Sequence, residues 1–190
     1  MSDRLSSLDG SFLRVETPSA HMHVAWSATF RRAPDAPPPT LSALRSSVLG
    51  RLEQTPRFRR RLAFPPPGMG EPFWVDDEAF DIARHVVVLG EHGETVDDER
   101  FHELCDCSLS EPLDRSLPLW RIYLAPRMSD GRCGMVAKIH HALVDGKSAV
   151  EVALLLFDVA PEPPPGPEPE WHPESSPGTA RLPSAGRALP

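Results

Sequence analysis

The stretch CGMVAKIHHALVDG (residues 133–146) leads from a largely apolar run into two adjacent histidines and then an Asp-Gly pair. The run that ends at His140 predicts a buried strand. If this strand continues through His141, successive side chains point to opposite faces of the sheet. His140 then shares a face with Lys138, while His141 shares the other face with Ile139. The two histidines cannot both reach one reacting atom, so we expect one to perform chemistry and the other to support it.

The residues before this stretch predict a neighbouring strand, LWRIYLAP (119–126), joined to it by the turn RMSDGR (127–132). Alternating or β-branched residues predict further strands at 21–30, 57–64, 73–75 and 85–89.

Apolar residues at helical spacing predict helices over 41–55, 95–106 and 148–159, with Thr40 and Thr95 as N-caps of the first two. Residues 1–20 predict a turn with a short helix or strand. Strands and helices mix along the chain, so the fold class is α/β or α+β.

Composition changes sharply near residue 161. Ten of the 23 prolines lie in residues 161–190, and this segment has too few apolar residues to form a core. We therefore expect a domain over residues 1–160 and a Pro-rich linker or disordered tail over 161–190.

Charge and composition exclude several classes of protein. A net charge of −7 argues against a nucleic-acid-binding protein, which usually presents a basic face. Three cysteines with a single C-x-C pair indicate neither a disulfide framework nor a zinc site. The N-terminus has no apolar signal-peptide core, and no window approaches the roughly 18 apolar residues of a membrane span. We expect a cytoplasmic protein, or one that lies peripherally on the inner membrane or a lipid droplet.

The histidine pair offers a general base, because a neutral imidazole accepts a proton near neutral pH. Asp145 could orient such a ring, and Gly146 leaves space beside it for a substrate. On the pattern alone, a structural role for both histidines stays open. No metal site is predicted, since the pair lacks the helical spacing of H-E-x-x-H.

H-H-x-x-x-D-G is the signature of the acyltransferase superfamily that includes chloramphenicol acetyltransferase, carnitine acyltransferases and the condensation domains of peptide synthetases. Within it, the chain most resembles the bacterial wax ester synthase/diacylglycerol acyltransferase family, from residue 5 to about 160. The blocks that carry the resemblance are LSSLDGSFLRVETPSAHMHV (5–24), PRFRRRL (56–62), EPFWVDDEAFDIARHV (71–86) and SLSEPLDRSLPLWRIYL (108–124). It implies a chloramphenicol acetyltransferase-like half, an α/β (α+β) sandwich in which helices cover a mixed sheet.

Carried onto this sequence, the resemblance makes His141 the general base and His140 its structural neighbour. Asp145 becomes a bracing carboxylate, and Gly146 becomes the gap through which substrate approaches.

The resemblance also implies roles outside the motif. Pro118, Leu119 and Trp120 form the family's Pro-Leu-Trp motif, which either lines the acyl tunnel or packs the start of a strand. By analogy with condensation domains, Arg59 or Arg61 pairs with Asp145; the alternative is a solvated strand face.

The implied reaction transfers a fatty acyl group from acyl-CoA to a long-chain alcohol or to diacylglycerol, in wax ester or triacylglycerol synthesis. Acyl-CoA is then a co-substrate, and no bound cofactor, metal or acyl-enzyme is expected. The basic run Arg57, Arg59, Arg60 and Arg61 either meets CoA phosphates or anionic lipid, or serves the structure.

Members of the resembled family consist of two halves of related topology, and this sequence resembles the N-terminal half. We therefore expect a truncated chain that works with a separate C-terminal half or by self-association, or a relic that still folds. A non-catalytic half-domain that binds a partner polypeptide or a lipid surface is the alternative from another class. Within the enzyme class, a polyketide or peptidyl alcohol as the acyl acceptor stays open.

Overall fold

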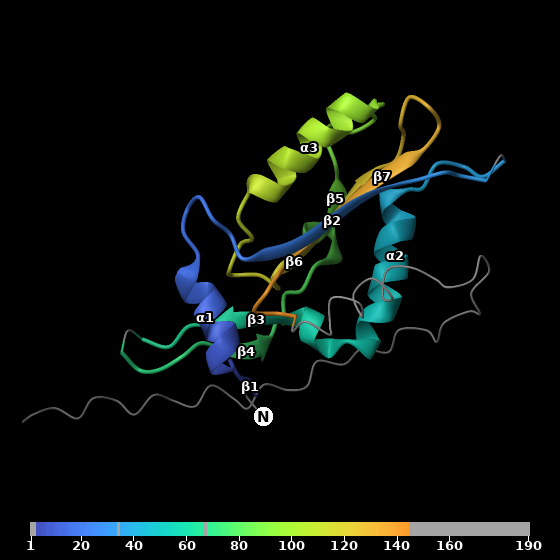
Figure 1. The fold of residues 1–190 in the computed structure, drawn as a ribbon. Coiled ribbons are helices and arrows are strands. Elements are labelled where there is room, and N and C mark those ends of the chain that lie inside the picture. Colours follow the sequence, from blue (N-terminus) through green and yellow to red (C-terminus); the bar gives the residue numbers. More distant parts are fainter. Residues whose placement is uncertain (1–2, 34, 67, 145–190) are drawn as a thin grey trace, which may run out of the picture.

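A computed structural model describes residues 3–33, 35–66 and 68–144 of the chain. Its centre is a four-stranded mixed sheet in the order β2-β7-β6-β5 (Figure 1). The strands are β2 (His23–Phe30), β5 (Val86–Val88), β6 (Trp120–Ala125) and β7 (Cys133–His140). β7 pairs antiparallel with β2 and with β6, whereas β5 pairs parallel with β6. The predicted neighbours 119–126 and 133–140 are thus confirmed as adjacent strands.

A smaller antiparallel sheet has the order β1-β4-β3, built from β1 (Asp3–Arg4), β4 (Phe73–Asp76) and β3 (Arg60–Ala63). The prediction of a strand over 57–64 was wrong in its first part, because Pro56–Arg59 form the 3₁₀ turn η2. Pro56 sets the helical φ at the first position of this turn, and the Phe58 side chain is buried. The Phe58 carbonyl accepts the indole N–H of Trp120 at 2.8 Å, which holds it away from a strand ladder.

Among the described residues, three α-helices surround the sheets: α1 (Ser7–Val15), α2 (Leu41–Arg51) and α3 (Asp98–Ser110). Thr40 caps α2 as predicted, since its hydroxyl accepts the N–H of Ala43 at 3.1 Å. The helix over 41–55 ends earlier than predicted, at Arg51, and continues as the 3₁₀ turn η1 (Leu52–Gln54). A further 3₁₀ turn, η3 (Ile82–Arg84), precedes β5.

The predicted cap of the third helix was wrong. Asp97, not Thr95, caps α3, because its carboxylate accepts the N–H of Arg100 at 2.8 Å. Val96 is still extended and forms a parallel bridge with Met128, so the helix cannot begin before Asp97.

Helices pack on both faces of the four-stranded sheet, so alternate strand residues enter two separate cores. Ile122 and Leu124 of β6 join one core with Val48 of α2. Tyr123 and Ala125, which point the other way, join a second core with Phe101 of α3. This helix–sheet–helix layering confirms the expected α/β (α+β) sandwich (Figure 1).

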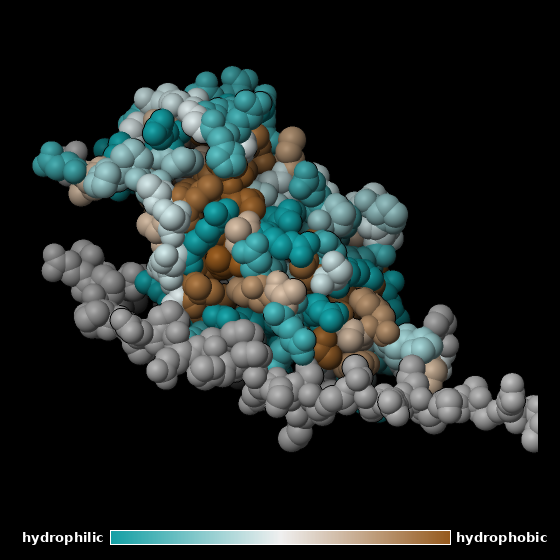
Figure 2. Space-filling view, turned by 180° about the vertical axis from the view of Figure 1, so that it is seen from behind, coloured by the Kyte–Doolittle hydropathy of each residue, from teal (hydrophilic) through white to brown (hydrophobic). Residues whose placement is uncertain are grey.

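Seen from behind, the molecule has an apolar area bordered by hydrophilic side chains (Figure 2). β5 is one of the two edge strands of the larger sheet, and its Val87 and Val88 are only half-buried. Within the described part of the chain, no helix combines the length and apolar character needed to cross a membrane.

Several predictions lie outside the described residues. These are the helix over 148–159, the end of the domain at residue 160 and the tail over 161–190, together with Asp145 and Gly146 of the motif.

Candidate active site

The histidine pair lies where β7 ends. His140 is the last residue of the strand, and His141 begins a turn over residues 141–143. The strand therefore does not continue through His141, as it would have to for the predicted alternation. Two backbone hydrogen bonds hold the turn: the His141 N–H donates to the Met22 carbonyl at 2.8 Å, and the Leu143 N–H donates to the His140 carbonyl at 2.9 Å. The turn gives the two rings different surroundings.

His140 is 1% exposed, and its ring is held on both sides. Its Nδ1 lies 2.9 Å from the N–H of Ala142 and must accept, because a backbone N–H can only donate. In the neutral ring the proton therefore sits on Nε2, which lies 3.3 Å from Glu16 Oε1. Burial lowers the pKa of His140, although the charge of Glu16 raises it in part. A buried neutral ring, hydrogen-bonded to the turn at Nδ1 and next to a carboxylate at Nε2, suits a supporting role.

Glu16 directly follows α1, and its side chain is 11% exposed. The carboxylate lies close to several groups. Its Oε1 accepts the N–H of Met22 at 3.0 Å, and its Oε2 pairs with Arg115. His23 Nε2 lies 3.9 Å away. Burial raises the pKa of Glu16, but hydrogen bonds from Arg115 and Met22 outweigh it and hold the pKa below its usual value. Glu16 is therefore a carboxylate at neutral pH.

His141 is half-buried and lies against α1. Its ring stacks on Phe12, with centroids 4.9 Å apart and ring planes at 22°. From the other side of the turn, the Arg57 guanidinium donates to the Ala142 carbonyl at 3.1 Å and lies 3.6 Å from the Asp9 carboxylate. Residues of α1 and η2 thus hold both the ring and the backbone of the turn.

Pro118, Leu119 and Trp120 lie in the protein core. All three are buried, and the Leu119 carbonyl accepts the N–H of His140 at 3.0 Å. The Trp120 indole stacks on His85, with centroids 4.5 Å apart. This placement favours a packing role at the start of the strand over a role in lining a tunnel. The hydrogen bond between Leu119 and His140 also holds the end of β7 next to the start of β6.

The two arginines suggested as partners of Asp145 lie in unlike places. Arg59 is 5% exposed with its guanidinium 5.3 Å from the centre of the Phe80 ring, and burial lowers its pKa. Arg61 is more exposed and lies 3.9 Å from Asp77. Because Asp145 lies outside the described residues, its pairing stays a prediction.

Sequence reasoning missed three residues that touch the histidine turn or its supports. Arg57 had been grouped only with the basic run, and Glu16 was part of a family block without a role. Arg115 likewise lay in a family block without a role. Within that basic run, Arg57 and Arg61 lie near Asp9 and Asp77, and Arg60 pairs with Asp76 at 3.0 Å.

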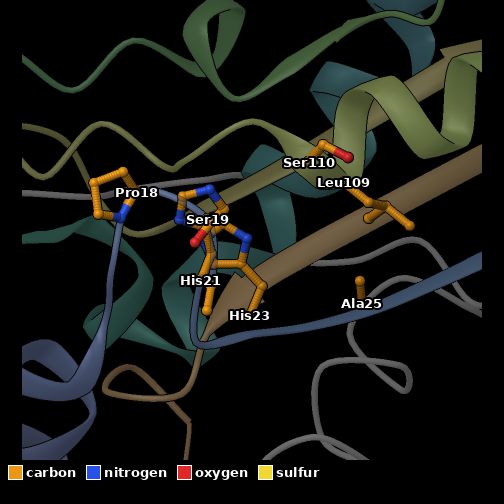
Figure 3. A pocket seen from close by; sticks show the side chains of 8 residues that line it. Pro18, Ser19, His21, His23, Ala25, Leu109 and Ser110 are labelled. Atoms are coloured by element: carbon orange, nitrogen blue, oxygen red, sulfur yellow. The ribbon is translucent and has the colours of Figure 1, made fainter.

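A cavity of about 500 Å³ lies beside β2 and the end of α3 (Figure 3). His21 and His23 stack in its wall with centroids 5.3 Å apart, and the His23 ring meets that of His140 edge-on at 6.1 Å. Burial lowers the pKa of His23 to about 4. The lining residues are Pro18, Ser19, Ala20, His21, His23, Ala25, Leu109 and Ser110. The described residues contain no group of three or more His, Cys, Asp or Glu side chains that could hold a metal ion.

Comparison with known proteins shows the family to which the chain belongs. Residues 5–189 match the family model described as the wax ester synthase/diacylglycerol acyltransferase catalytic domain. The probable diacylglycerol O-acyltransferase tgs3 of Mycobacterium tuberculosis is 38% identical over 186 residues, which cover 96% of this chain and 66% of tgs3. The probable diacylglycerol O-acyltransferase tgs1 of the same species is 33% identical over 82% of this chain and 33% of its own length.

Solved structures show the same fold. The wax ester synthase/diacylglycerol acyltransferase from Marinobacter aquaeolei VT8 superposes with a TM-score of 0.69 at 28% identity, covering 99% of this chain and 43% of that one. The starter condensation domain of rhizomide synthetase RzmA has a TM-score of 0.59 at 13% identity, over 82% of this chain and 36% of its own. The chain therefore spans between about one third and two thirds of the length of these proteins.

Proposed function

Since the chain belongs to the wax ester synthase/diacylglycerol acyltransferase family, we propose that it transfers a fatty acyl group from acyl-CoA to an alcohol hydroxyl. The acceptor is a long-chain alcohol or a diacylglycerol. The observation that carries the proposal is the division of labour between the two histidines. His140 is buried, with Nδ1 hydrogen-bonded to the turn and Nε2 3.3 Å from the Glu16 carboxylate, whereas His141 is half-buried in a turn that other elements brace.

In this reaction His141 is the general base. The acceptor oxygen bonds to the thioester carbonyl carbon while its proton passes to His141. The carbon–sulfur bond then breaks, and the protonated His141 ring returns the proton to the departing CoA thiolate. General-base catalysis of this kind contributes about 10²–10⁴-fold in rate. The step needs acyl-CoA as co-substrate and uses no bound cofactor or metal.

Asp145 and Gly146 keep the roles that the family resemblance implies, bracing and access for substrate. For the backbone of the turn itself, we assign the bracing role to Arg57, which donates to the Ala142 carbonyl.

We also propose that the chain works in the cytoplasm, at the surface of the inner membrane or of a lipid droplet, where apolar acceptors concentrate. Four large apolar side chains support this: Leu8, Val15, Phe64 and Met69 are each more than half exposed. Leu8 and Val15 belong to α1, whereas Phe64 and Met69 belong to the segment between β3 and β4. The Arg14 guanidinium of α1 pairs with the Glu71 carboxylate of that segment at 2.6 Å, which joins the two parts. Co-sedimentation with phospholipid vesicles should fall when Leu8 and Met69 are both changed to Ser.

The decisive test is esterification of hexadecanol and of a diacylglycerol by the purified 190-residue chain with palmitoyl-CoA. His141→Ala should lower turnover by at least about 10²-fold. His102→Ala is the matched control, because His102 is exposed on α3 and should leave turnover unchanged. The assay is run at several protein concentrations, since self-association would make the specific activity rise with concentration.

Equal turnover by the wild type and His141→Ala would remove His141 as the base. If neither acceptor is esterified at any concentration, either by the chain alone or after addition of a matching C-terminal half, while vesicle binding persists, the chain is a lipid-binding module and not a transferase.

A further inference from the structure

The carboxylate of Glu16 connects to the histidine turn by two routes that start from the same oxygen. Oε1 lies 3.3 Å from His140 Nε2 and accepts the Met22 N–H at 3.0 Å. We propose that Glu16 is a positioning residue for His141, acting through the His140 ring and through the Met22 backbone.

The first route runs through the His140 ring, which lies between Glu16 and the turn. Its Nε2 faces the carboxylate, and its Nδ1 accepts the N–H of Ala142, the residue after His141. A negative charge next to Nε2 favours the tautomer that carries the proton there. The opposite tautomer would set an Nδ1 proton against the Ala142 N–H, so that two donors faced each other. Glu16 therefore selects the form of His140 that can hold the turn.

The second route runs through one backbone residue. Met22 donates its N–H to Glu16 and accepts the His141 N–H at its carbonyl, at 2.8 Å. His23, the next residue, opens β2 in register with His140, so the end of the sheet also fixes where Met22 lies. Movement of the carboxylate would shift Met22, and with it the carbonyl that accepts the His141 N–H.

Glu16 is itself held in place. Its Oε2 pairs with Arg115, whose guanidinium also donates to the Leu13 carbonyl at 3.0 Å near the end of α1. The carboxylate is mostly shielded from solvent, and such pairs are stronger than exposed ones. Arg115 thus presents Oε1 toward His140 and Met22.

A merely structural role for Glu16, tying the end of α1 to the sheet, is the competing explanation. It predicts loss of stability without any change in the tautomer of His140. The two explanations therefore differ in a signal that does not depend on turnover: the ring nitrogens of His140 in a long-range ¹H–¹⁵N correlation spectrum of the histidines.

The experiment compares Glu16→Ala and Glu16→Gln with the wild-type chain, with Glu103→Gln as the matched control. Glu103 is an exposed glutamate on α3 that also pairs with an arginine, Arg100, but it does not touch the turn. In Glu16→Ala, kcat should fall by roughly 10- to 100-fold with little change in KM, because misplaced catalytic groups cost about this much. The His140 nitrogens should lose the pattern of one protonated and one unprotonated site.

Glu16→Gln should restore most of that nitrogen pattern, since its amide oxygen can face the same two N–H groups. Its kcat should lie between those of the wild type and Glu16→Ala. Thermal unfolding and near-ultraviolet circular dichroism confirm that each variant is folded; if Glu16→Ala is not, Glu16→Ser takes its place, with the same expected loss of the nitrogen pattern. Unchanged His140 nitrogens in a folded Glu16→Ala chain would overturn the proposal, whatever happens to kcat.

The kinetic part of this proposal rests on the proposed function, but the spectroscopic part does not. A wild-type chain without transferase activity, both alone and with a matching C-terminal half, would refute only the proposed function. The His140 spectrum would then decide on its own whether Glu16 positions the turn.

Discussion

Phe12 of α1 stacks on His141, with ring centroids 4.9 Å apart and ring planes at 22°. An aromatic side chain from the first helix thus orients a ring that stands at the end of β7. Aromatic pairs contribute about 0.5–1.5 kcal/mol beyond their buried area, which corresponds to about 2- to 12-fold in a rate. Phe12→Leu should therefore lower kcat for acyl transfer by about this factor. Ser7→Ala, an exposed change on the same helix, is the control. A folded Phe12→Leu chain with wild-type kcat would show that the stack does not orient the base.

Close packing of α3 on β7 should make Gly134 intolerant of any side chain. A Cβ built at this position would lie 2.3 Å from the Phe101 ring. Gly134→Ala should therefore lower the free energy of unfolding by about 1–3 kcal/mol. Gly50 in α2 has open space at the same atom, so Gly50→Ala should raise the free energy of unfolding by about 0.5–1 kcal/mol. Urea unfolding of both variants measures the contrast, and equal effects would contradict it.

Lys138 is 2% exposed and joins β7 to the end of α3, where its ammonium donates to the carbonyls of Ser108 and Glu111. Replacing it with Met leaves these two carbonyls without their partner and should lower the free energy of unfolding by about 2 kcal/mol or more. A variant as stable as the wild type would show that these two hydrogen bonds do not outweigh the free-energy cost of burying the ammonium.

The same lysine should make stability depend on alkaline pH. Burial lowers the pKa of Lys138 from 10.5 to about 8. Between these two values the unfolded chain keeps a proton that the folded chain has released, so stability from this group rises with pH. The difference in unfolding free energy between the wild type and Lys138→Met should therefore widen between pH 8 and pH 10. A constant difference over this range would contradict the expected titration.

Acid should destabilise the fold through its buried histidines. Burial lowers the pKa of His23 to about 4 and also lowers the pKa values of His85 and His140. As the pH falls from about 6.5 through about 4, the unfolded chain binds protons before the folded chain does, and stability is lost. His23→Gln should reduce this loss, whereas His92→Gln, at an exposed loop position, should not. Stability curves for the three proteins between pH 7 and pH 4.5 give the comparison.

Local sequence patterns predicted much of the fold. Apolar runs of strand length predicted β6 and β7, and the Thr40 cap with its apolar spacing predicted the start of α2. The errors arose where a distant partner outweighed the local preference. Residues 57–59 are not part of a strand because the Trp120 indole binds the Phe58 carbonyl. The third helix starts late because Val96 bridges to Met128.

The candidate site divides in the same way. The sequence by itself determined that two histidines stand at the end of an apolar strand, because that information lies in adjacent residues. Only the tertiary structure decided that His140 is the buried one and that Glu16 and Arg57 support the turn. Ion pairs and hydrogen bonds between residues far apart in the chain leave no periodicity in the sequence, since they depend on distances that exist only after the sheets and helices have packed.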